Sequence, residues 1–225
     1  MRKVSKMLVM AGLLLVGSPV FAQKHEYVDL GLPSGTLWAT CNVGADAPEE
    51  YGDYFAWGET TSKSTYKWSN YKYCVDDGEN LTKYCSRSYY GFGGFTDDLK
   101  TLQPDDDAAT ANWGDEWCTP TYVQWVELYQ HTTRRWMTRK GVYGMLFTSS
   151  NGRSLFMPAA GYYGYDGLSY AGRHGRYWSS SLNANTPGYA SSSYFNKLTD
   201  HTYQMVDCDR VDGYSVRPVR STRQN

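Results

Sequence analysis

The chain has 225 residues, of which 41% are hydrophobic and 20% are charged, with 22 Lys and Arg against 23 Asp and Glu. This length is sufficient to bury one hydrophobic core. The balanced charge argues against a nucleic-acid partner, and the hydrophobic content argues against an intrinsically disordered chain. The 21 Tyr, 8 Trp and 22 Gly indicate a loop-rich α+β or β domain, because aromatic side chains favour strands and Gly favours turns.

The first 22 residues have the pattern of a secretory signal peptide. Arg2, Lys3 and Lys6 precede an apolar run at 7–17, and a small-residue cleavage site ends at Ala22. The run is too short to span a bilayer, and no longer one follows, so we expect no transmembrane segment. Cleavage removes three basic and no acidic residues, which changes the net charge from −1 to −4. We predict an exported protein that is periplasmic, at the cell surface or secreted.

Export permits disulfide bonds, and all five cysteines follow the expected signal peptide. Because five is an odd number, at least one thiol lacks an internal partner. Cys74 and Cys85 close a short loop, and we expect this pair to form a disulfide. A second pairing, between Cys41 and Cys118, stays open. The cysteines and the four histidines lack the spacing of a zinc site, so no metal ligands are predicted.

The first part of the exported chain predicts short strands. Residues 26–44 alternate in polarity on both sides of a turn at 32–35, which indicates two strands. Residues 51–59 indicate a third strand that is rich in aromatic side chains. The polar, irregular stretch at 60–113 is too long for an ordinary connection. It predicts either a structured excursion or a functional loop region.

One helix is predicted, at 122–131. Thr121 is the expected N-cap, and Gln124 stands at the position that completes a capping box. Helical spacing predicts a core-facing stripe, formed by Tyr122, Trp125, Val126 and Tyr129.

A hairpin and further short strands are predicted after the helix. Residues 142–149 and 153–157 flank the turn dipeptide Asn151-Gly152, which favours a tight hairpin. Further strands fit residues 176–180, 191–196 and 214–219. The pattern predicts one α+β domain with short antiparallel strands.

Six segments of the chain together resemble a known protein family. In chain order they are YVDLGLPSGTLWATCNVGA, GDYFAWGET, DDAATANWGDEWCTPTYVQWVEL, FMPAAGYY, RYWSSSLN and GYSVRPVR. Their order and coverage resemble the Fibrobacter succinogenes major paralogous domain family of exported Bacteroidetes proteins. The resemblance implies one C-type-lectin-like domain over 23–225, with a small antiparallel sheet, one or two helices and long loops. It also implies a recognition domain without established catalytic residues.

An acidic segment raises the alternative of calcium binding. QPDDD at 103–107 offers several carboxylates on a loop, and it begins with a tripeptide that galactose-type C-type lectins use around calcium. WGD at 113–115 resembles the Trp-Asn-Asp of those lectins. Both pieces precede the main helix, however, and Gly114 lacks the amide ligand. We therefore expect Asp106 and Asp107 to cap backbone amides, and we retain a calcium-dependent glycan-binding lectin as an alternative.

Two aromatic stretches, at 89–92 and 162–165, are candidate stacking platforms for sugars or peptides. The alternative is tyrosine packing at loop edges. Catalysis is not indicated, because Cys118 and Cys208 do not match the motif of the formylglycine-generating oxidases that share the implied fold. Ser179-Ser180-Ser181 lacks a neighbouring His or a nucleophile elbow. We therefore expect neither enzymatic activity nor a cofactor.

The end of the chain supplies the candidate binding face. Residues 186–212 resemble the variable region of proteins diversified by retroelements, in which AAY codons become NNY codons and never encode Lys, Glu, Gln, Met or Trp. None of these five residue types occurs at 186–189, 198–203, 206–209 or 211–212. The alternative is an exposed loop of an ordinary family member. The predicted ligand contacts are Thr186, Tyr189, Leu198, Thr199, Asp200, His201, Tyr203, Asp207, Asp209 and Asp212.

The sequence thus predicts an exported, non-catalytic domain that binds a protein or glycan at the cell surface through residues 186–212. A structural surface or fimbria-associated component is a further alternative. Nucleic acid is not an expected partner.

Overall fold

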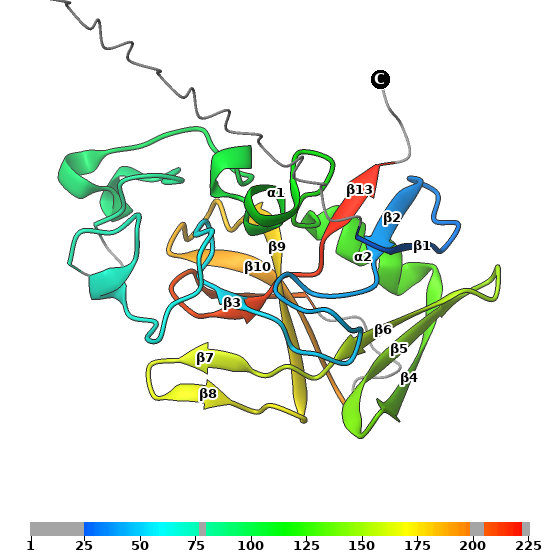
Figure 1. The fold of residues 1–225 in the computed structure, drawn as a ribbon. Helices are drawn as coiled ribbons and strands as arrows, with labels where there is room; N and C mark the ends of the chain where they lie inside the picture. Colours follow the sequence, from blue (N-terminus) through cyan, green and yellow to red (C-terminus); the bar gives the residue numbers. More distant parts are fainter. Residues whose placement is uncertain (1–24, 77–79, 199–204, 222–225) are drawn as a thin grey trace, which may run out of the picture.

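The computed structural model describes residues 25–76, 80–198 and 205–221 (Figure 1). The expected signal peptide at 1–22 lies outside the described residues. Within them, no helix combines the length and apolar character needed to cross a membrane. The described residues are mainly β, with several small sheets of short strands and two short α-helices. This agrees with the predicted α+β class.

The strands are β1 (Tyr27–Asp29), β2 (Thr36–Ala39), β3 (Tyr54–Phe55), β4 (Thr132–Arg139), β5 (Val142–Ser149), β6 (Ser154–Pro158), β7 (Tyr162–Gly164), β8 (Gly167–Ser169), β9 (His174–Leu182), β10 (Tyr189–Asn196), β11 (Met205–Asp209), β12 (Tyr214–Ser215) and β13 (Val219–Ser221). The helices are α1 (Ala108–Trp113) and α2 (Tyr122–Gln130), with short 3-10 turns η1 (Trp68–Asn70), η2 (Ser88–Tyr90), η3 (Phe92–Gly94) and η4 (Pro104–Asp106).

The largest sheet has five strands in the order β11-β10-β9-β12-β3. β10 pairs antiparallel with both β9 and β11, whereas β12 pairs parallel with β9. Successive side chains on a strand point to opposite faces, so Trp178 and its neighbour Tyr177 belong to different core clusters. Both faces of the β9–β10 ribbon are therefore buried, and β11 forms an edge of the sheet.

The core consists of two clusters on either side of this ribbon. The first includes Trp57, Tyr71, Trp178 and Tyr214. The second lies against α2 and includes Trp38, Trp125, Phe147 and Phe195. Removing a large apolar side chain from water stabilises the fold by about 2–3 kcal/mol, so these clusters account for much of the favourable free energy of folding.

Strands from the two ends of the described chain share one sheet, in the order β1-β2-β13. Val219 of β13 pairs with Trp38 of β2, and Val28 of β1 pairs with the same residue from the other side. The Trp38 ring also meets Trp125 of α2 edge to face at 4.8 Å. This sheet therefore closes the domain over the main helix (Figure 1).

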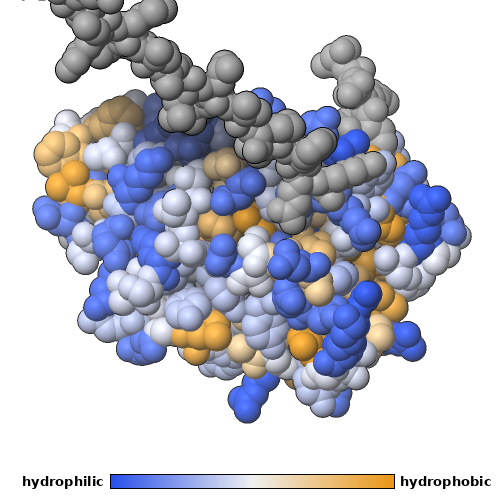
Figure 2. All heavy atoms as spheres, viewed as in Figure 1, coloured by the Kyte–Doolittle hydropathy of each residue, from blue (hydrophilic) through white to orange (hydrophobic). Residues whose placement is uncertain are grey.

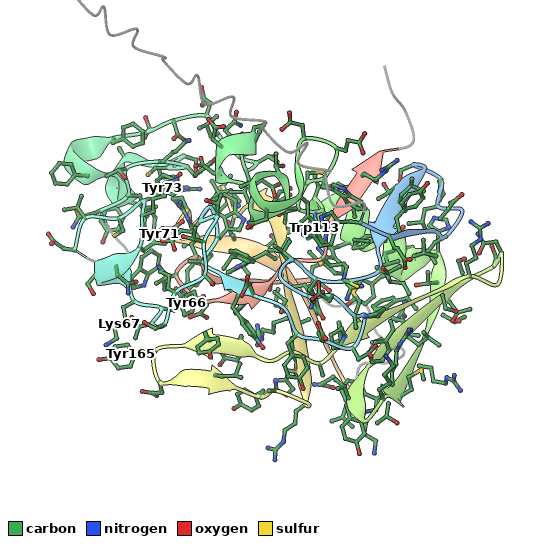
Figure 3. All side chains as sticks on the ribbon, in the orientation of Figure 1. Tyr66, Lys67, Tyr71, Tyr73, Trp113 and Tyr165 are labelled. Atoms are coloured by element: carbon green, nitrogen blue, oxygen red, sulfur yellow. The ribbon has the colours of Figure 1, made fainter. Side chains whose placement is uncertain are left out.

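The stretch at 60–113 is a structured excursion held by buried tyrosines. The Tyr66 hydroxyl donates to the carbonyl of Tyr54, and the Tyr71 hydroxyl donates to that of Trp57, both at 2.5 Å. Tyr66, Tyr71 and Tyr73 lie one beside another in this region (Figure 3). Each ring thus packs in the core while its hydroxyl forms a hydrogen bond with a backbone carbonyl, as a buried tyrosine requires.

Local signals predicted several elements correctly. β1 and β2 flank the expected turn, in which Gly35 N–H donates to the Leu32 carbonyl. Thr121 caps α2, and its capping box with Gln124 is complete. The hairpin of β5 and β6 surrounds Asn151-Gly152 as predicted.

Three predictions about the elements need correction. The core face of α2 contains Leu128 as well as Trp125 and Tyr129, whereas Tyr122 is 40% exposed. The predicted strand at 214–219 is two strands, β12 and β13, because the chain passes from one sheet to another at 216–218. The third strand expected at 51–59 is short, since only Tyr54–Phe55 pairs with β12.

Candidate functional site

An open cavity of about 530 Å³ lies at the edge strand β11. We call it the Arg176 cavity. Its lining consists of Tyr162, Arg176, Tyr189, Tyr194, Val206, Asp207, Cys208, Asp209, Asp212 and Tyr214. Four of the predicted contact residues are among them, namely Tyr189, Asp207, Asp209 and Asp212. The structure therefore brings residues from 189 to 212 together with aromatic residues from β7, β10 and β12.

Strand register explains how one cavity collects these side chains. Arg176 pairs with Tyr194, and Ala190 pairs with Cys208, which places Arg176, Tyr194 and Cys208 on one face of the sheet. Tyr189 pairs with Asp209 and belongs to the opposite face. Because residues of both faces line the cavity, it extends around the edge of β11.

The Arg176 guanidinium is surrounded by tyrosine rings. Its carbon lies 4.7 Å from the ring centre of Tyr194, 5.3 Å from that of Tyr162 and 5.7 Å from that of Tyr214. Nη1 donates to Cys208 Sγ at 3.0 Å. The buried Nε has no hydrogen-bond partner, and Arg176 forms no ion pair with the other described residues. The cation is thus held in place by aromatic contacts and retains donors for a ligand.

Two carboxylates of the cavity lining have altered acidity. Burial raises the pKa of Asp209, and burial together with the nearby charge of Asp209 raises the pKa of Asp212 to about 6. The Tyr214 hydroxyl donates to Asp212 Oδ2 at 3.4 Å, and the Asp212 N–H donates to the Asp209 carbonyl. The pair therefore occupies a tight turn at which one carboxyl changes charge just below neutral pH.

Asp207 has a different environment from the other two carboxylates. It accepts hydrogen bonds from Asn183 Nδ2 at 2.9 Å and from the Ser191 hydroxyl at 2.8 Å. Both of its oxygens are thus occupied within the protein. Asp207 positions β11 against β10 and the 183–186 turn, while Asp209 and Asp212 keep more acceptor capacity.

Gly213 fixes the two cavity walls relative to each other. Its N–H and carbonyl both bond with the backbone of Tyr163 at 2.8 Å. A Cβ at this position would lie 2.6 Å from Cζ of Tyr66. Only glycine leaves room for the Tyr66 ring at this position, and the backbone pairing with Tyr163 sets Tyr162 beside Asp212 and Tyr214.

The remaining predicted contacts fall elsewhere. Thr186 lies in the turn before β10, where its N–H donates to the Asn183 carbonyl, and it does not line the cavity. Leu198 is 87% exposed and lines a neighbouring hollow. The predicted contacts outside the described residues are Thr199, Asp200, His201 and Tyr203.

Sequence reasoning missed three central residues, Arg176, Tyr194 and Tyr214. Arg176 and Tyr214 stand within two of the six segments that resemble the known family, RYWSSSLN and GYSVRPVR, where no ligand contact was predicted. The alternation of side chains along a strand could have indicated Arg176. It puts Arg176 on the same face as the buried Trp178, at the end where that face becomes partly exposed.

The acidic segment at 103–107 is engaged within the protein. Asp106 forms ion pairs with Lys72 at 3.1 Å and Lys83 at 2.5 Å. It also accepts from the hydroxyls of Tyr73 and Tyr84. Burial alone would raise the pKa of the Asp106 carboxyl, but these hydrogen bonds hold it below its ordinary value. The expectation that Asp106 caps backbone amides is wrong, because its partners are side chains.

Asp107 does cap backbone amides, as predicted. It is the N-cap of α1 and accepts from the Ala109 N–H at 2.8 Å. It also accepts from the N–H and hydroxyl of Thr119. The part of the chain that the structure describes contains no group of three or more His, Cys, Asp or Glu arranged to hold a metal ion.

The aromatic stretches divide between surface and core. Tyr89 is 73% exposed and Phe92 is 56% exposed, whereas Tyr162 and Tyr163 pack against the first core cluster. Tyr165 is exposed, and Lys67 Nζ lies 4.5 Å from its ring centre (Figure 3). On the face of the molecule that Figure 2 shows, hydrophobic residues lie in small groups among polar ones.

None of the five cysteines, all of which lie in described segments, forms a disulfide in the structure. The thiols of the expected pair bond locally instead, with Cys74 donating to the Val75 carbonyl and Cys85 to the Arg87 carbonyl. Cys208 lines the Arg176 cavity, and Cys118 pairs with Val219 of β13. The structure does not bring Cys118 into the lining of that cavity.

Comparison with known proteins adds no identification. No family model, no curated protein and no solved structure matches the chain. The chemistry of the Arg176 cavity and the resemblance of the six segments are therefore the grounds on which function is proposed.

Proposed function

We propose that the protein is an exported, non-catalytic recognition domain that binds its ligand in the Arg176 cavity. The observation that carries this proposal is that the ring-enclosed guanidinium of Arg176 shares one cavity lining with Tyr189, Asp209 and Asp212. A site with tyrosine rings, one cation and two carboxylates offers apolar contact, donors and acceptors together, as binding pockets do.

We further propose a C-type-lectin-like fold and membership of the family that the six segments resemble. Contacts between the segments support this. Trp57 Nε1 donates to the Ser179 carbonyl at 2.8 Å, and Trp178 Nε1 donates to the Phe55 carbonyl at 2.7 Å. Buried Arg217 joins two further segments, because its Nε donates to Asn42 Oδ1 at 2.8 Å. The shared residues thus form a mutually bonded framework.

The ligand is a protein or a glycan whose polar groups match this lining. Diversification of residues 186–212 remains part of the proposal, supported by the position of Asp207 and Asp209 on an edge strand. Codons 183–213 and the neighbouring DNA test it. A near-copy with AAY codons at these positions beside a reverse transcriptase supports diversification, and absence of such a copy rejects it.

Binding itself is tested with a printed glycan array and a displayed peptide library, probed with the wild-type protein and with Arg176→Gln. We expect ligands that the wild type retains and that Arg176→Gln binds at least tenfold more weakly. Tyr189→Ala removes an exposed ring of the cavity lining and should weaken binding of the same ligands without affecting folding. Arg135→Gln on β4 is the matched control, since Arg135 is exposed and does not line the cavity.

Two results would reject the proposal. One is a set of ligands that bind Arg176→Gln and Tyr189→Ala as tightly as the wild type. The other is binding that EDTA abolishes, because that is the result expected of a calcium-dependent lectin.

A further inference from the structure

A second hollow, of about 430 Å³, opens where β9 begins and β10 ends. We call it the Trp136 hollow. It is lined by Trp136, Tyr143, Gly172, Arg173, His174, Asn196, Lys197 and Leu198. None of these residues lines the Arg176 cavity. The two concavities are neighbours, because the His174 ring meets the Tyr194 ring edge-on at 5.3 Å.

Two aromatic rings form one side of the Trp136 hollow. Tyr143 pairs with Thr138, so Trp136 and Tyr143 are diagonal neighbours on one face of the β4–β5 hairpin. Their rings are nearly parallel, at 15° with centres 6.2 Å apart. Tyr143 is 51% exposed. Trp136 is half-buried against the second core cluster, which fixes its position beside the exposed Tyr143 ring. Rigid aromatic rings stack against the C–H face of a sugar ring at low entropic cost.

The other side of the hollow is polar and positively charged. Arg173 and Lys197 line it, and neither forms an ion pair with another described residue. His174 adds a ring nitrogen, Nδ1, that is buried without a hydrogen-bond partner. Among the described residues, no Asp or Glu lines it. Its charge is thus opposite to that of the carboxylates in the neighbouring Arg176 cavity.

We propose that the Trp136 hollow binds an acidic saccharide, with a sugar ring stacked on Trp136 and Tyr143 and its carboxylate or sulfate held by Arg173 and Lys197. A neutral sugar would leave both cations without an ionic partner among the described residues and the ligand. A simple anion would leave the aromatic side of the hollow empty. Arg favours planar carboxylates through paired hydrogen bonds, and Lys adds a point charge. This site is independent of the Arg176 cavity and does not require that cavity to be functional.

The test uses isothermal titration of purified protein with four defined probes. They are an oligogalacturonate, which carries carboxylates, a heparin tetrasaccharide, which carries sulfates, cellotetraose, which is neutral, and oligoglutamate, which is acidic but not a sugar. We expect at least one acidic saccharide to bind and the other two probes to bind at least tenfold more weakly. The preference between oligogalacturonate and heparin identifies the acidic group.

Variants then locate the site. Arg173→Gln with Lys197→Gln, and separately Tyr143→Ala, should each weaken the acidic saccharide at least tenfold. Lys100→Gln and Tyr27→Ala remove an exposed cation and an exposed ring outside the hollow, and they should leave binding unchanged. Higher salt should weaken binding, because exposed charges are screened.

Several outcomes overturn the proposal. These are no binding of either acidic saccharide, equal binding of cellotetraose, equal binding of oligoglutamate, or equal losses in the control variants. Arg176→Gln keeps the two proposals separate. It should weaken binding at the Arg176 cavity at least tenfold and leave binding of the acidic saccharide unchanged.

Discussion

The Nε of Arg210 donates a hydrogen bond of 2.9 Å to the hydroxyl of Tyr71. Arg210 follows β11 directly, whereas Tyr71 belongs to the excursion at 60–113. The remaining guanidinium nitrogens donate to the carbonyls of Lys83, Tyr84 and Pro187. One fully buried cation thus joins the excursion, the turn before β10 and the edge strand that borders the Arg176 cavity.

Replacing this cation should destabilise the whole domain. Arg210→Met leaves three buried carbonyls and a tyrosine hydroxyl without their donors, each of which carries a desolvation penalty. We expect the free energy of unfolding to fall by about 3 kcal/mol or more. Urea denaturation measures it, with Arg153→Met as control, because the Arg153 side chain is 60% exposed. Equal, small decreases in the free energy of unfolding of both variants would show that the hydrogen bonds of Arg210 add little to stability.

Stability should depend on pH through Asp212. Its pKa is raised to about 6 from an ordinary value of 3.8, so the folded state favours the protonated carboxyl. The resulting stabilisation is fully present below about pH 4 and is lost as pH rises through about 6. We expect Asp212→Asn to stabilise the protein by about 1–2 kcal/mol at pH 7.5, a figure reduced for partial solvent screening, and to change little at pH 4. A difference that is the same at both pH values would contradict this.

Calcium should not affect thermal stability. Asp106 is already paired with Lys72 and Lys83, and Asp107 caps α1. Displacing these partners would expose unpaired cations and amides. We therefore expect the melting temperature to be the same, within about 1 °C, in calcium and in EDTA. Differential scanning calorimetry measures this, and a clear rise in calcium would favour the lectin alternative instead.

Gly213 should be intolerant of even one added carbon. In Gly213→Ala the new Cβ would lie 2.6 Å from the Tyr66 ring, and relieving this contact should cost about 1–3 kcal/mol. The double variant with Tyr66→Leu removes the clashing ring. A double-mutant cycle should therefore show that the two substitutions together cost less than the sum of their separate effects. Strict additivity would mean that Tyr66 is not the obstacle.

The predictable parts of the fold depend on residues close together in sequence. The cap at Thr121 and the turn at Asn151-Gly152 each involve a few neighbouring residues. β4 was not predicted, because most of its residues, TTRRWMTR, are polar. It is an edge strand that pairs only with β5. The split of 214–219 also required tertiary information, since Arg217 turns inward to bond Asn42 and distant carbonyls.

The candidate site shows the same division. Tyr189, Asp207, Asp209 and Asp212 were found because they share one segment with a recognisable composition. Arg176 and Tyr162 were not assigned to it, because only the pairing of β9 with β10 and the bond between Tyr163 and Gly213 bring them there. Contacts between residues far apart in the chain have no signature in a single sequence.

Small buried side chains make the ribbon beneath the cavity unusual. Ser179, Ser191, Ser192 and Ser193 stand where sheets commonly have branched apolar residues. Their hydroxyls bond to the Ser191 carbonyl, Asp207, the Val206 carbonyl and Tyr129, in that order. Serine side chains are small and these are fixed by hydrogen bonds, so they have little room to rearrange. Replacing an exposed residue of the Arg176 cavity should therefore cause little structural change in the strands below. Exposed lining residues such as Tyr189 can therefore be replaced to change what the cavity binds, while the β9–β10 ribbon keeps its backbone conformation.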